Sequence, residues 1–347
     1  MARPQQQHDI LTKNSLPQFA RKLALQAHFD QVRDDLRQVE IRLRQQADSF
    51  DPEIHGYVAY ATATNGKRIR PALTLLAARA TGGSTAAHID LAAVVELIHL
   101  ASLIHDDVLD HAQLRRAKPT VNSKWGAELS VLLGDCLFAH ALQLCSRFAD
   151  QTVCRLVADA ANEVCTGEIL QTQRRFDLNL SPADYFKIVA MKTGALFRVS
   201  TELAAHLNQQ PPDTVAAYRV YGDSIGVAYQ IYDDCLDLFG SEDGSGKTLG
   251  TDLKKGKLTL PLLHALQQLD GPRLAAVSAT LLHGSDDDRA ALKTMVVELG
   301  GHVYAARQAQ EYLERAARRL ESLPVNAYAE TLQTIARTFA GELAELQ

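Results

Sequence analysis

The chain has 347 residues, of which 46% are hydrophobic and 22% charged, an ordinary balance for a folded protein with a sizeable core. Its formal net charge of -5 gives no reason to expect nucleic acid as a partner. Aromatic residues make up only 6%, whereas Ala, Leu and Gln abound, and this composition favours helices over sheets.

Cysteine usage and the apolar pattern predict a soluble, cytoplasmic protein. The five cysteines form no CxxC pair and have no nearby histidines at zinc-site spacing, so we expect reduced, buried thiols. The first residues, MARPQQQHDILTK, lack the apolar region of a signal peptide. The longest apolar stretch, Leu91 to Ile104, contains Glu96 and His99 and is too short to span a bilayer. We expect at most a transient contact with a membrane surface.

Helical periodicity recurs in almost every segment, and alternation with period two is scarce. Residues 1–17 are polar and are predicted to be disordered, whereas residues 18–47 are amphipathic and heavily charged on one face. After the turn at Asn65-Gly66, Pro71 suits the first turn of the next helix. The stretch that ends at Asp110 is apolar nearly all round, which predicts a helix at the centre of a bundle.

The second half of the chain continues the helical pattern after a basic loop at 111–120. Its one long loop without apolar content, residues 240–252, is rich in glycine and typical of lids and binding loops. No composition shift or linker divides the chain, so we predict one all-α domain over residues 18–347, a helical bundle around a central cavity. Further helices are predicted at about 129–149, 151–177, 182–207, 213–239, 257–269, 274–282, 286–299, 301–322 and 326–345.

Two aspartate clusters of the form DDxxD are the most informative motifs, and each follows an apolar helical stretch. On a helix, the first and last aspartates of such a motif lie one turn apart on a common face. That spacing suits a divalent cation with oxygen ligands. One copy alone is equally consistent with a solvated helix end, but two copies favour a cavity in which metal ions hold a polyanion. The clusters are Asp106, Asp107 and Asp110, and Asp233, Asp234 and Asp237.

Basic side chains recur at a few points around these clusters. Each has an ordinary explanation alone: loop arginines usually meet solvent, Lys192 would extend along apolar surface, and His99 would be a core histidine. Together they predict two diphosphate sites, one held through metals and one held directly by cationic groups. The apolar helices between would enclose a hydrocarbon tail. The basic groups are Lys67, Arg70, His99, Arg115, Arg116, Lys192, Lys247 and Lys257.

These residues resemble the trans-prenyltransferases, the head-to-tail polyprenyl diphosphate synthases. The resemblance covers about residues 50–345, and its motifs occur in the family's order. The matching stretches are GKRIRPAL (66–73), ELIHLASLIHDDVLDHAQLRRAKPT (96–120), GDCLFAHAL (134–142), KTGALF (192–197), YQIYDDCLD (229–237) and GKTLGTDLKKGKLTLPLL (246–263).

The resemblance implies a homodimer of the all-α isoprenoid synthase fold. It implies that an allylic diphosphate ionises to a carbocation, which attacks the double bond of isopentenyl diphosphate and then loses a proton. Three Mg²⁺ ions are expected to neutralise the departing diphosphate. The released diphosphate can accept the proton, so no protein base is expected.

Residue roles carry over motif by motif from the resemblance. Direct metal ligands would be Asp106, Asp110 and Asp233, while Asp107, Asp234 and Asp237 would act through waters or through bonds to other groups. The allylic diphosphate would be held by Arg115, Lys192 and Lys247. Isopentenyl diphosphate would be held by Lys67, Arg70, His99 and Arg116. The carbocation would be stabilised by Thr193 and Gln230, and the closed lid supported by Lys257.

Three features depart from the family pattern. His111 stands where an acid is commoner, and Ala117 replaces the glycine usual in RRGKPT. The end of the chain, RTFAGELAELQ, lacks the basic terminus that many members have. None of these removes a predicted ligand.

The residues before the first cluster bear on product length, because the product tail is expected to run down this helix. Ala101, five residues before Asp106, and the adjacent Ser102 are both small. Family members with short products commonly have aromatic residues here, so the tunnel is predicted to be open at its first turn. Further down, Ile98 offers moderate bulk and Phe138 on a neighbouring helix is a candidate floor. We expect a product of geranylgeranyl length or longer, with a long chain favoured.

Two other functions stay open. A class I terpene cyclase also uses DDxxD in an all-α fold, but it needs no second diphosphate site and usually carries an Asn/Ser/Glu motif in place of the second DDxxD. A non-catalytic subunit of a heteromeric synthase tends to lose aspartates, and here all six are present.

Overall fold

Helices form almost all the regular structure of the computed structural model, which describes residues 28–63, 66–116, 118–240 and 250–344. The all-α prediction is therefore confirmed. The predicted disordered segment, residues 1–17, and Lys247 lie outside the described residues. The helices are α3 (Arg33–Gln45), α4 (Pro52–Thr62), α5 (Ile69–Thr81), α6 (Ala86–Leu109), α7 (Val121–Cys145), α8 (Gln151–Gln173), α9 (Pro182–Val189), α10 (Ala195–Leu207), α11 (Pro212–Phe239), α12 (Thr251–Lys254), α13 (Leu260–Leu266), α14 (Gly271–His283), α15 (Asp286–Glu298), α16 (Gly301–Glu321) and α17 (Ala327–Ala344).

Three short helical turns and a two-stranded hairpin accompany these helices in the described chain. Two 3₁₀ turns, Asp30–Val32 and Gln46–Ser49, flank α3, and a π-helical turn, Ala190–Gly194, joins α9 to α10. The basic loop after α6 contains a minimal hairpin, in which β1 (Leu114–Arg115) pairs antiparallel with β2 (Lys118–Pro119).

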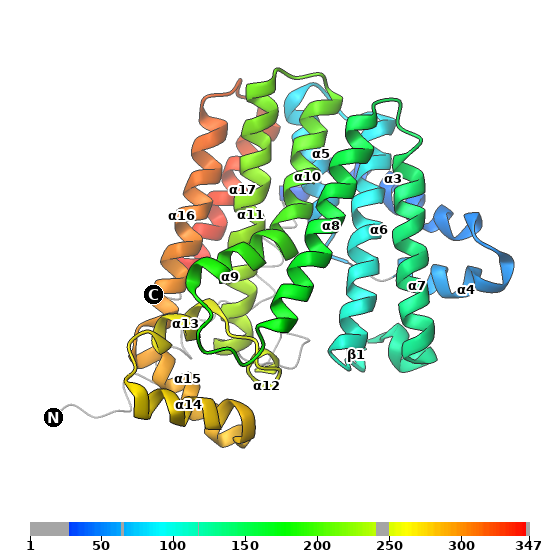
Figure 1. Ribbon diagram of the computed structural model, residues 1–347. Helices are drawn as coiled ribbons and strands as arrows, with labels where there is room; N and C mark the ends of the chain where they lie inside the picture. The colour runs from blue at the N-terminus through cyan, green and yellow to red at the C-terminus, as the bar shows by residue number, and fades with distance from the viewer. Residues whose placement is uncertain (1–27, 64–65, 117, 241–249, 345–347) are drawn as a thin grey trace.

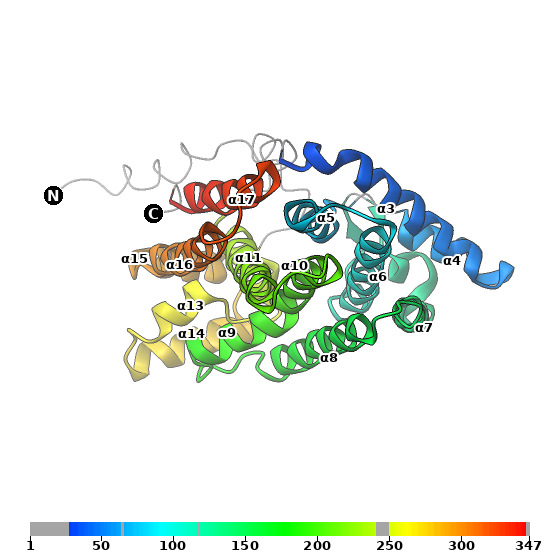
Figure 2. The ribbon, with the colours of Figure 1, turned by 90° about the horizontal axis from the view of Figure 1, so that it is seen from above.

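The long helices run side by side, with α10 and α11 inside the ring formed by the others (Figures 1 and 2). The apolar α6, predicted to lie at the centre of the bundle, is one helix of the ring around α10 and α11 (Figure 2), and it packs against α3, α5, α7 and α10. Its side chains Leu91, Leu97 and Ile98 are fully buried. By length and composition alone, both α6 and α7 could cross a membrane. The expectation from the sequence rested only on the apolar stretch within α6, Leu91 to Ile104, which by itself is too short. The apolar part of α6 is 67% buried inside the protein, as in the core helix of a globular domain.

Helix starts follow local capping more closely than hydrophobic periodicity. Thr85 and His88 form a capping box at the start of α6. The Thr120 side chain accepts a hydrogen bond from Ser123 N, so α7 begins at Val121 rather than near residue 129 as predicted. Within α7, Gly126 has φ +86°, a conformation that favours glycine and kinks the first turns.

Candidate active site

The two aspartate clusters meet at one end of the bundle. The first lies at the C-terminal end of α6 and the second near the C-terminal end of α11, both at the lower end of the long helices in Figure 1. A relay of contacts joins them. Lys257 Nζ lies 3.6 Å from Asp110 Oδ2 and 3.5 Å from Asp252 Oδ1, and Asp252 N donates a hydrogen bond to Asp237 Oδ2 at 3.1 Å. The clusters therefore belong to one site.

The three carboxylates of the first cluster have different surroundings. Asp107 accepts hydrogen bonds from Arg115 Nη2 at 2.7 Å and Nε at 2.9 Å. Asp110 lies 3.1 Å from Lys255 Nζ, and although burial alone would raise its pKa, nearby lysines outweigh burial and lower it. Burial raises the pKa of Asp106 to about 6, because neighbouring cations compensate only part of the desolvation.

The second cluster is more deeply buried. Asp234, only 6% exposed, accepts hydrogen bonds from the Tyr185 hydroxyl at 2.6 Å and from Gln230 Nε2 at 2.8 Å. Burial raises the pKa of Asp234 to about 8. Asp237 accepts a hydrogen bond from Thr251 Oγ1 at 3.1 Å, and burial, together with a neighbouring carboxylate, raises its pKa as well. Negative charge in this cluster is incompletely compensated by the side chains around it.

The chemistry of these carboxylates fits a divalent cation. Within the described part of the chain, no three Asp, Glu, His or Cys side chains form a ready metal cage. Carboxylate oxygens are nevertheless the ligands that Mg²⁺ and Ca²⁺ prefer. The raised pKa values of Asp106 and Asp234 show that both carboxylates would be stabilised by added positive charge.

The π-helical turn carries Lys192 and Thr193 into the site. Helices from both sides approach its backbone at glycines. A Cβ atom at Gly167 of α8 would lie 2.6 Å from Lys192 N, and a Cβ at Gly226 of α11 would lie 2.8 Å from the backbone of the turn. Larger residues at either position would push the turn out of place, so this unusual helical geometry depends on two close approaches. Single π turns often occur at functional sites.

The two side chains of this turn have polar partners. Lys192 Nζ forms an ion pair with Glu168 of α8 and donates a hydrogen bond to Gln171 Oε1 at 2.8 Å. Thr193 Oγ1 donates to Gln230 Oε1 at 2.8 Å. The charge of Lys192 also acts on Asp106 across the site, where it opposes the effect of burial.

A second, cationic group consists of Arg70 in the first turn of α5, His99 on α6 and Arg116 directly after β1. The Arg70 guanidinium lies over the Phe197 ring, 4.6 Å from its centroid, and burial lowers the pKa of Arg70. Arg70 Nε is buried and has no hydrogen-bond partner in the described structure. Burial also lowers the pKa of His99 far below its usual value, and the charges of Arg70 and Arg116 add to this effect. Such a group is suited to receive an anion.

Gly66 allows this group to pack closely. A Cβ atom at this position would lie 3.0 Å from Arg116 Nη1, 3.0 Å from Arg68 Nη1 and 3.3 Å from Glu96 Oε1. Arg68 Nη1 donates a hydrogen bond to Glu96 at 2.7 Å, so a buried carboxylate supports the guanidinium groups from inside the protein. Lys67, in the same turn, is exposed.

The residues predicted to line the product tunnel lie on two helices, three of them on α6 and Phe138 on α7. Ala101 and Ile98 are fully buried on α6, and the Ser102 hydroxyl donates to a backbone carbonyl one turn earlier at 2.8 Å. Phe138 stacks on His105, with ring centroids 6.4 Å apart. Phe138 therefore packs on the residue that immediately precedes the first cluster, and its role as the floor of the tunnel stays a prediction.

Sequence reasoning did not single out four residues that contact the predicted site residues, nor Glu96, which contacts Arg68 beside them. A buried acid within an apolar stretch was the available signal for Glu96, but the others become visible only through contacts between distant segments. They are Glu96, which binds Arg68; Glu168 and Gln171, which bind Lys192; Tyr185, which binds Asp234; and Lys255, which pairs with Asp110.

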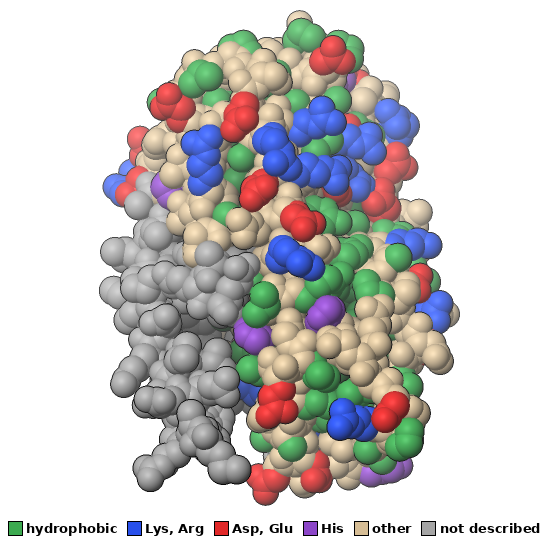
Figure 3. Space-filling view, turned by 90° about the vertical axis from the view of Figure 1, so that its left-hand side faces the viewer, with side chains coloured by type: hydrophobic (Ala, Val, Ile, Leu, Met, Phe, Trp, Pro, Cys, Tyr) green, Lys and Arg blue, Asp and Glu red, His purple; other side chains and the backbone are tan. Residues whose placement is uncertain are grey.

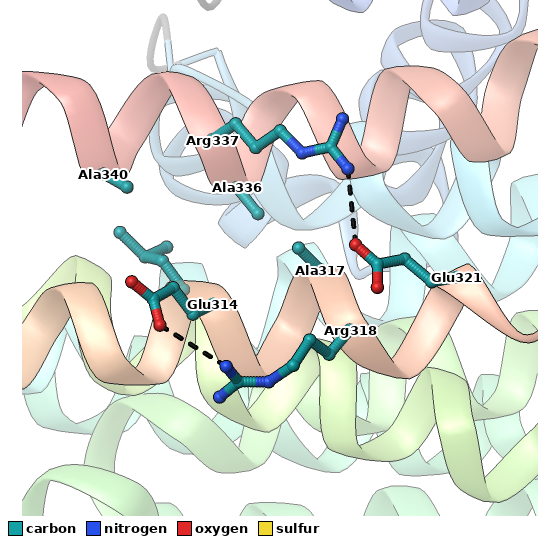
Figure 4. A pocket seen from close by; sticks show the side chains of 8 residues that line it. Glu314, Ala317, Arg318, Glu321, Ala336, Arg337 and Ala340 are labelled. Carbon is teal, nitrogen blue, oxygen red and sulfur yellow. Dashed lines mark hydrogen bonds and ion pairs between the residues drawn. The ribbon is translucent and has the colours of Figure 1, made fainter.

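A separate pocket of about 200 Å³ lies between α16 and α17 (Figure 4). Its rim carries two ion pairs, Arg318–Glu314 and Arg337–Glu321, each at 3.4 Å. The side of the molecule that carries α16 shows Lys and Arg side chains interspersed with Asp and Glu (Figure 3). Neither aspartate cluster nor the cationic group lines this pocket.

An all-α bundle with two DDxxD clusters and an adjacent cationic group defines a helical enzyme site for diphosphate chemistry. The sequence matches the family model described as polyprenyl synthetase over residues 51–299. It is 34% identical over 305 residues to the octaprenyl diphosphate synthase of Haemophilus influenzae, a match that covers 87% of this chain and 92% of that one. The chain therefore belongs to the polyprenyl synthetase family and is a prenyltransferase.

Solved structures agree with this assignment. The decaprenyl diphosphate synthase of Rhodobacter capsulatus superimposes with a TM-score of 0.86 at 32% identity, over 92% of this chain and 99% of that one. A polyprenyl synthase from Caulobacter crescentus, complexed with calcium and isoprenyl diphosphate, gives a TM-score of 0.83 at 34% identity, over 90% and 96% of the two chains. The predicted family and fold are thus confirmed.

Proposed function

We propose that this protein is a long-chain polyprenyl diphosphate synthase that condenses an allylic diphosphate with isopentenyl diphosphate. The observation that carries this proposal is the pairing of two different anion sites. One consists of buried carboxylates that need added cations, and the other of Arg70, His99 and Arg116 beside them. A terpene cyclase would need only the first.

In this proposal the allylic diphosphate binds between the aspartate clusters, with Arg115, Lys192 and Lys247 on its oxygens. Mg²⁺ held by the clusters would supply the positive charge that stabilises the departing diphosphate. The neighbour that was solved with calcium and isoprenyl diphosphate supports a divalent cation in this role, and the family resemblance suggests three. Lys257, which lies between Asp110 and Asp252, would hold the two walls of the site together.

Isopentenyl diphosphate would bind to Arg70, His99, Arg116 and the exposed Lys67. His99 would act in its neutral form, since burial and nearby arginines lower its pKa. The hydroxyl of Thr193 and the amide of Gln230 would direct oxygen atoms at the allylic carbocation, and the departed diphosphate would take the proton that completes the step. The apolar faces of the surrounding helices would exclude water, which would otherwise capture the cation.

Named relatives support a long product, because the proteins described above make octaprenyl and decaprenyl diphosphates. The small, buried Ala101 supports the same conclusion. To test the proposal, purified protein with Mg²⁺ and isopentenyl diphosphate should be offered geranyl, farnesyl and geranylgeranyl diphosphate as primers, and products resolved by mass spectrometry. From geranyl or farnesyl diphosphate, linear products of more than four isoprene units would support it, whereas a cyclic hydrocarbon or products of four units or fewer would contradict it.

We further propose that the protein is a cytoplasmic homodimer. An exposed apolar stripe on α7 supports this, since Leu132 is 61% exposed and Cys136 and Ala139 continue along the same face at helical spacing. The prediction of buried thiols is wrong for Cys136, which is exposed. Ile169 on the neighbouring α8 is 58% exposed. Exposed apolar side chains on neighbouring helices are typical of a subunit interface. Membrane contact would then be limited to release of the long apolar product.

A further inference from the structure

A buried chain of hydrogen bonds links α9 to the π-helical turn through α11. The Tyr185 hydroxyl donates to Asp234 Oδ2 at 2.6 Å, and Gln230 Nε2 donates to Asp234 Oδ1 at 2.8 Å. Thr193 Oγ1 then donates to Gln230 Oε1 at 2.8 Å. Tyr185, Asp234 and Thr193 are 4%, 6% and 5% exposed, so water competes little for these bonds.

The direction of each bond in this chain is determined by the bond before it. In its ionised form, as required when the cluster holds divalent cations, Asp234 only accepts, so both Tyr185 and Gln230 donate to it. The amide nitrogen of Gln230 is thereby committed to Asp234, and its oxygen must face Thr193. Thr193 must in turn give its one proton to that oxygen. Its remaining lone pairs are then free to face the site, as stabilisation of a cation requires.

We propose that Tyr185 is a positioning residue for the condensation: through Asp234 and Gln230 it sets the orientation of the Thr193 hydroxyl that faces the allylic carbocation. This inference rests on the proposed function. Without the Tyr185 hydroxyl, Asp234 would lose one of its two hydrogen-bond donors and could turn. The Gln230 amide could then flip, and Thr193 would no longer be held with its lone pairs toward the substrate. Oriented dipoles matter mainly when charge develops, so the effect should fall on kcat.

The test is Tyr185→Phe, which removes only the hydroxyl. The expected result is a fall in kcat of about tenfold or more, with KM for both diphosphates within about twofold of the parent values. Phe186→Leu is the matched control, because Phe186 packs edge-on against Tyr185, with ring centroids 5.6 Å apart, and contributes no polar atom. It should leave kcat within about twofold.

A double-mutant cycle separates this role from a structural one. In a Thr193→Val background, Tyr185→Phe should cost less than about twofold further, because its target hydroxyl is already gone. The proposal would be overturned if Tyr185→Phe left kcat unchanged, or if the losses in kcat of the two single variants multiplied in the double variant. It would also be overturned if high Mg²⁺ restored kcat of Tyr185→Phe, because Tyr185 would then act on metal binding. If Tyr185→Phe does not fold, Tyr185→Met replaces it in the same cycle. Absence of turnover in the parent enzyme would instead refute the proposed function.

Discussion

Glu96 and Arg68 form an ion pair of 2.7 Å in which the side chains are 4% and 8% exposed. Arg68 also holds Glu40 of α3 at 2.5 Å, so one guanidinium joins α3, the turn before α5 and the middle of α6. Arg68 has φ +48°, a backbone conformation that costs energy for a residue other than glycine. The two contacts hold this strained turn, which contains Lys67 and leads directly into the first turn of α5, where Arg70 lies.

Glu96→Gln should destabilise the protein because it leaves Arg68 buried with one fewer counter-charge. We expect a loss of about 2–4 kcal/mol in the free energy of unfolding, measured by chemical denaturation. Glu40→Gln is the matched control, and since the Glu40 side chain is 34% exposed, its loss should be about 1 kcal/mol or less. Equal losses in the two variants would contradict the special importance of Glu96.

The helices and the identity of the site were accessible from the sequence because both depend on local spacing. Hydrophobic periodicity located the long helices, and the repeated DDxxD motif located the two acidic walls. Contacts between distant segments were not accessible. Tyr185 meets Asp234 across 49 positions, and the π-helical turn depends on close approach by Gly167 and Gly226. The early start of α7 depends on a single cap at Thr120, which periodicity does not reveal.

The buried His99 should make the protein less stable in mild acid. Its pKa in the folded state is far below the usual value of about 6.5, which the unfolded chain retains. As pH falls below that value, the unfolded chain takes up a proton that the folded protein excludes, so stability is lost.

His99→Gln removes this contribution. When the pH is lowered from 7.5 to 5.5, the free energy of unfolding should fall in both proteins, and the fall should be about 1 kcal/mol smaller in the variant than in the parent. Urea titration at each pH measures this difference. His111→Gln, at an exposed position of the loop after α6, is the matched control and should follow the parent. Parallel pH profiles for the parent and His99→Gln would contradict the assignment.

Product length should respond to bulk at Ala101. Ala101→Phe places an aromatic ring at a fully buried position on α6, five residues before Asp106, and should shorten the product by several isoprene units. Mass spectrometry of products from one primer measures this directly. Ala149→Phe introduces the same ring at an exposed loop position and should leave the product distribution unchanged. If Ala101→Phe gives the parent distribution, the tunnel does not pass this residue.

The apolar stripe on α7 should control assembly. Leu132→Glu places a charge at the centre of the proposed interface and should convert a dimer to a monomer, as measured by sedimentation equilibrium. Leu282→Glu on α14 is the matched control, because Leu282 is similarly exposed at 51% but lies outside the stripe. A parent protein that is monomeric, or a Leu132→Glu variant that stays dimeric, would refute this interface.

Release of diphosphate, followed with and without isopentenyl diphosphate, tests the central claim most directly. The account requires two substrates: an allylic diphosphate that leaves from the carboxylate site and an isopentenyl diphosphate held by the cationic group. With Mg²⁺ and farnesyl diphosphate alone, release should be slow. Adding isopentenyl diphosphate should accelerate it and give one diphosphate for each isopentenyl unit incorporated into a linear product. Equally fast release from farnesyl diphosphate alone, with a hydrocarbon as product, would contradict the account.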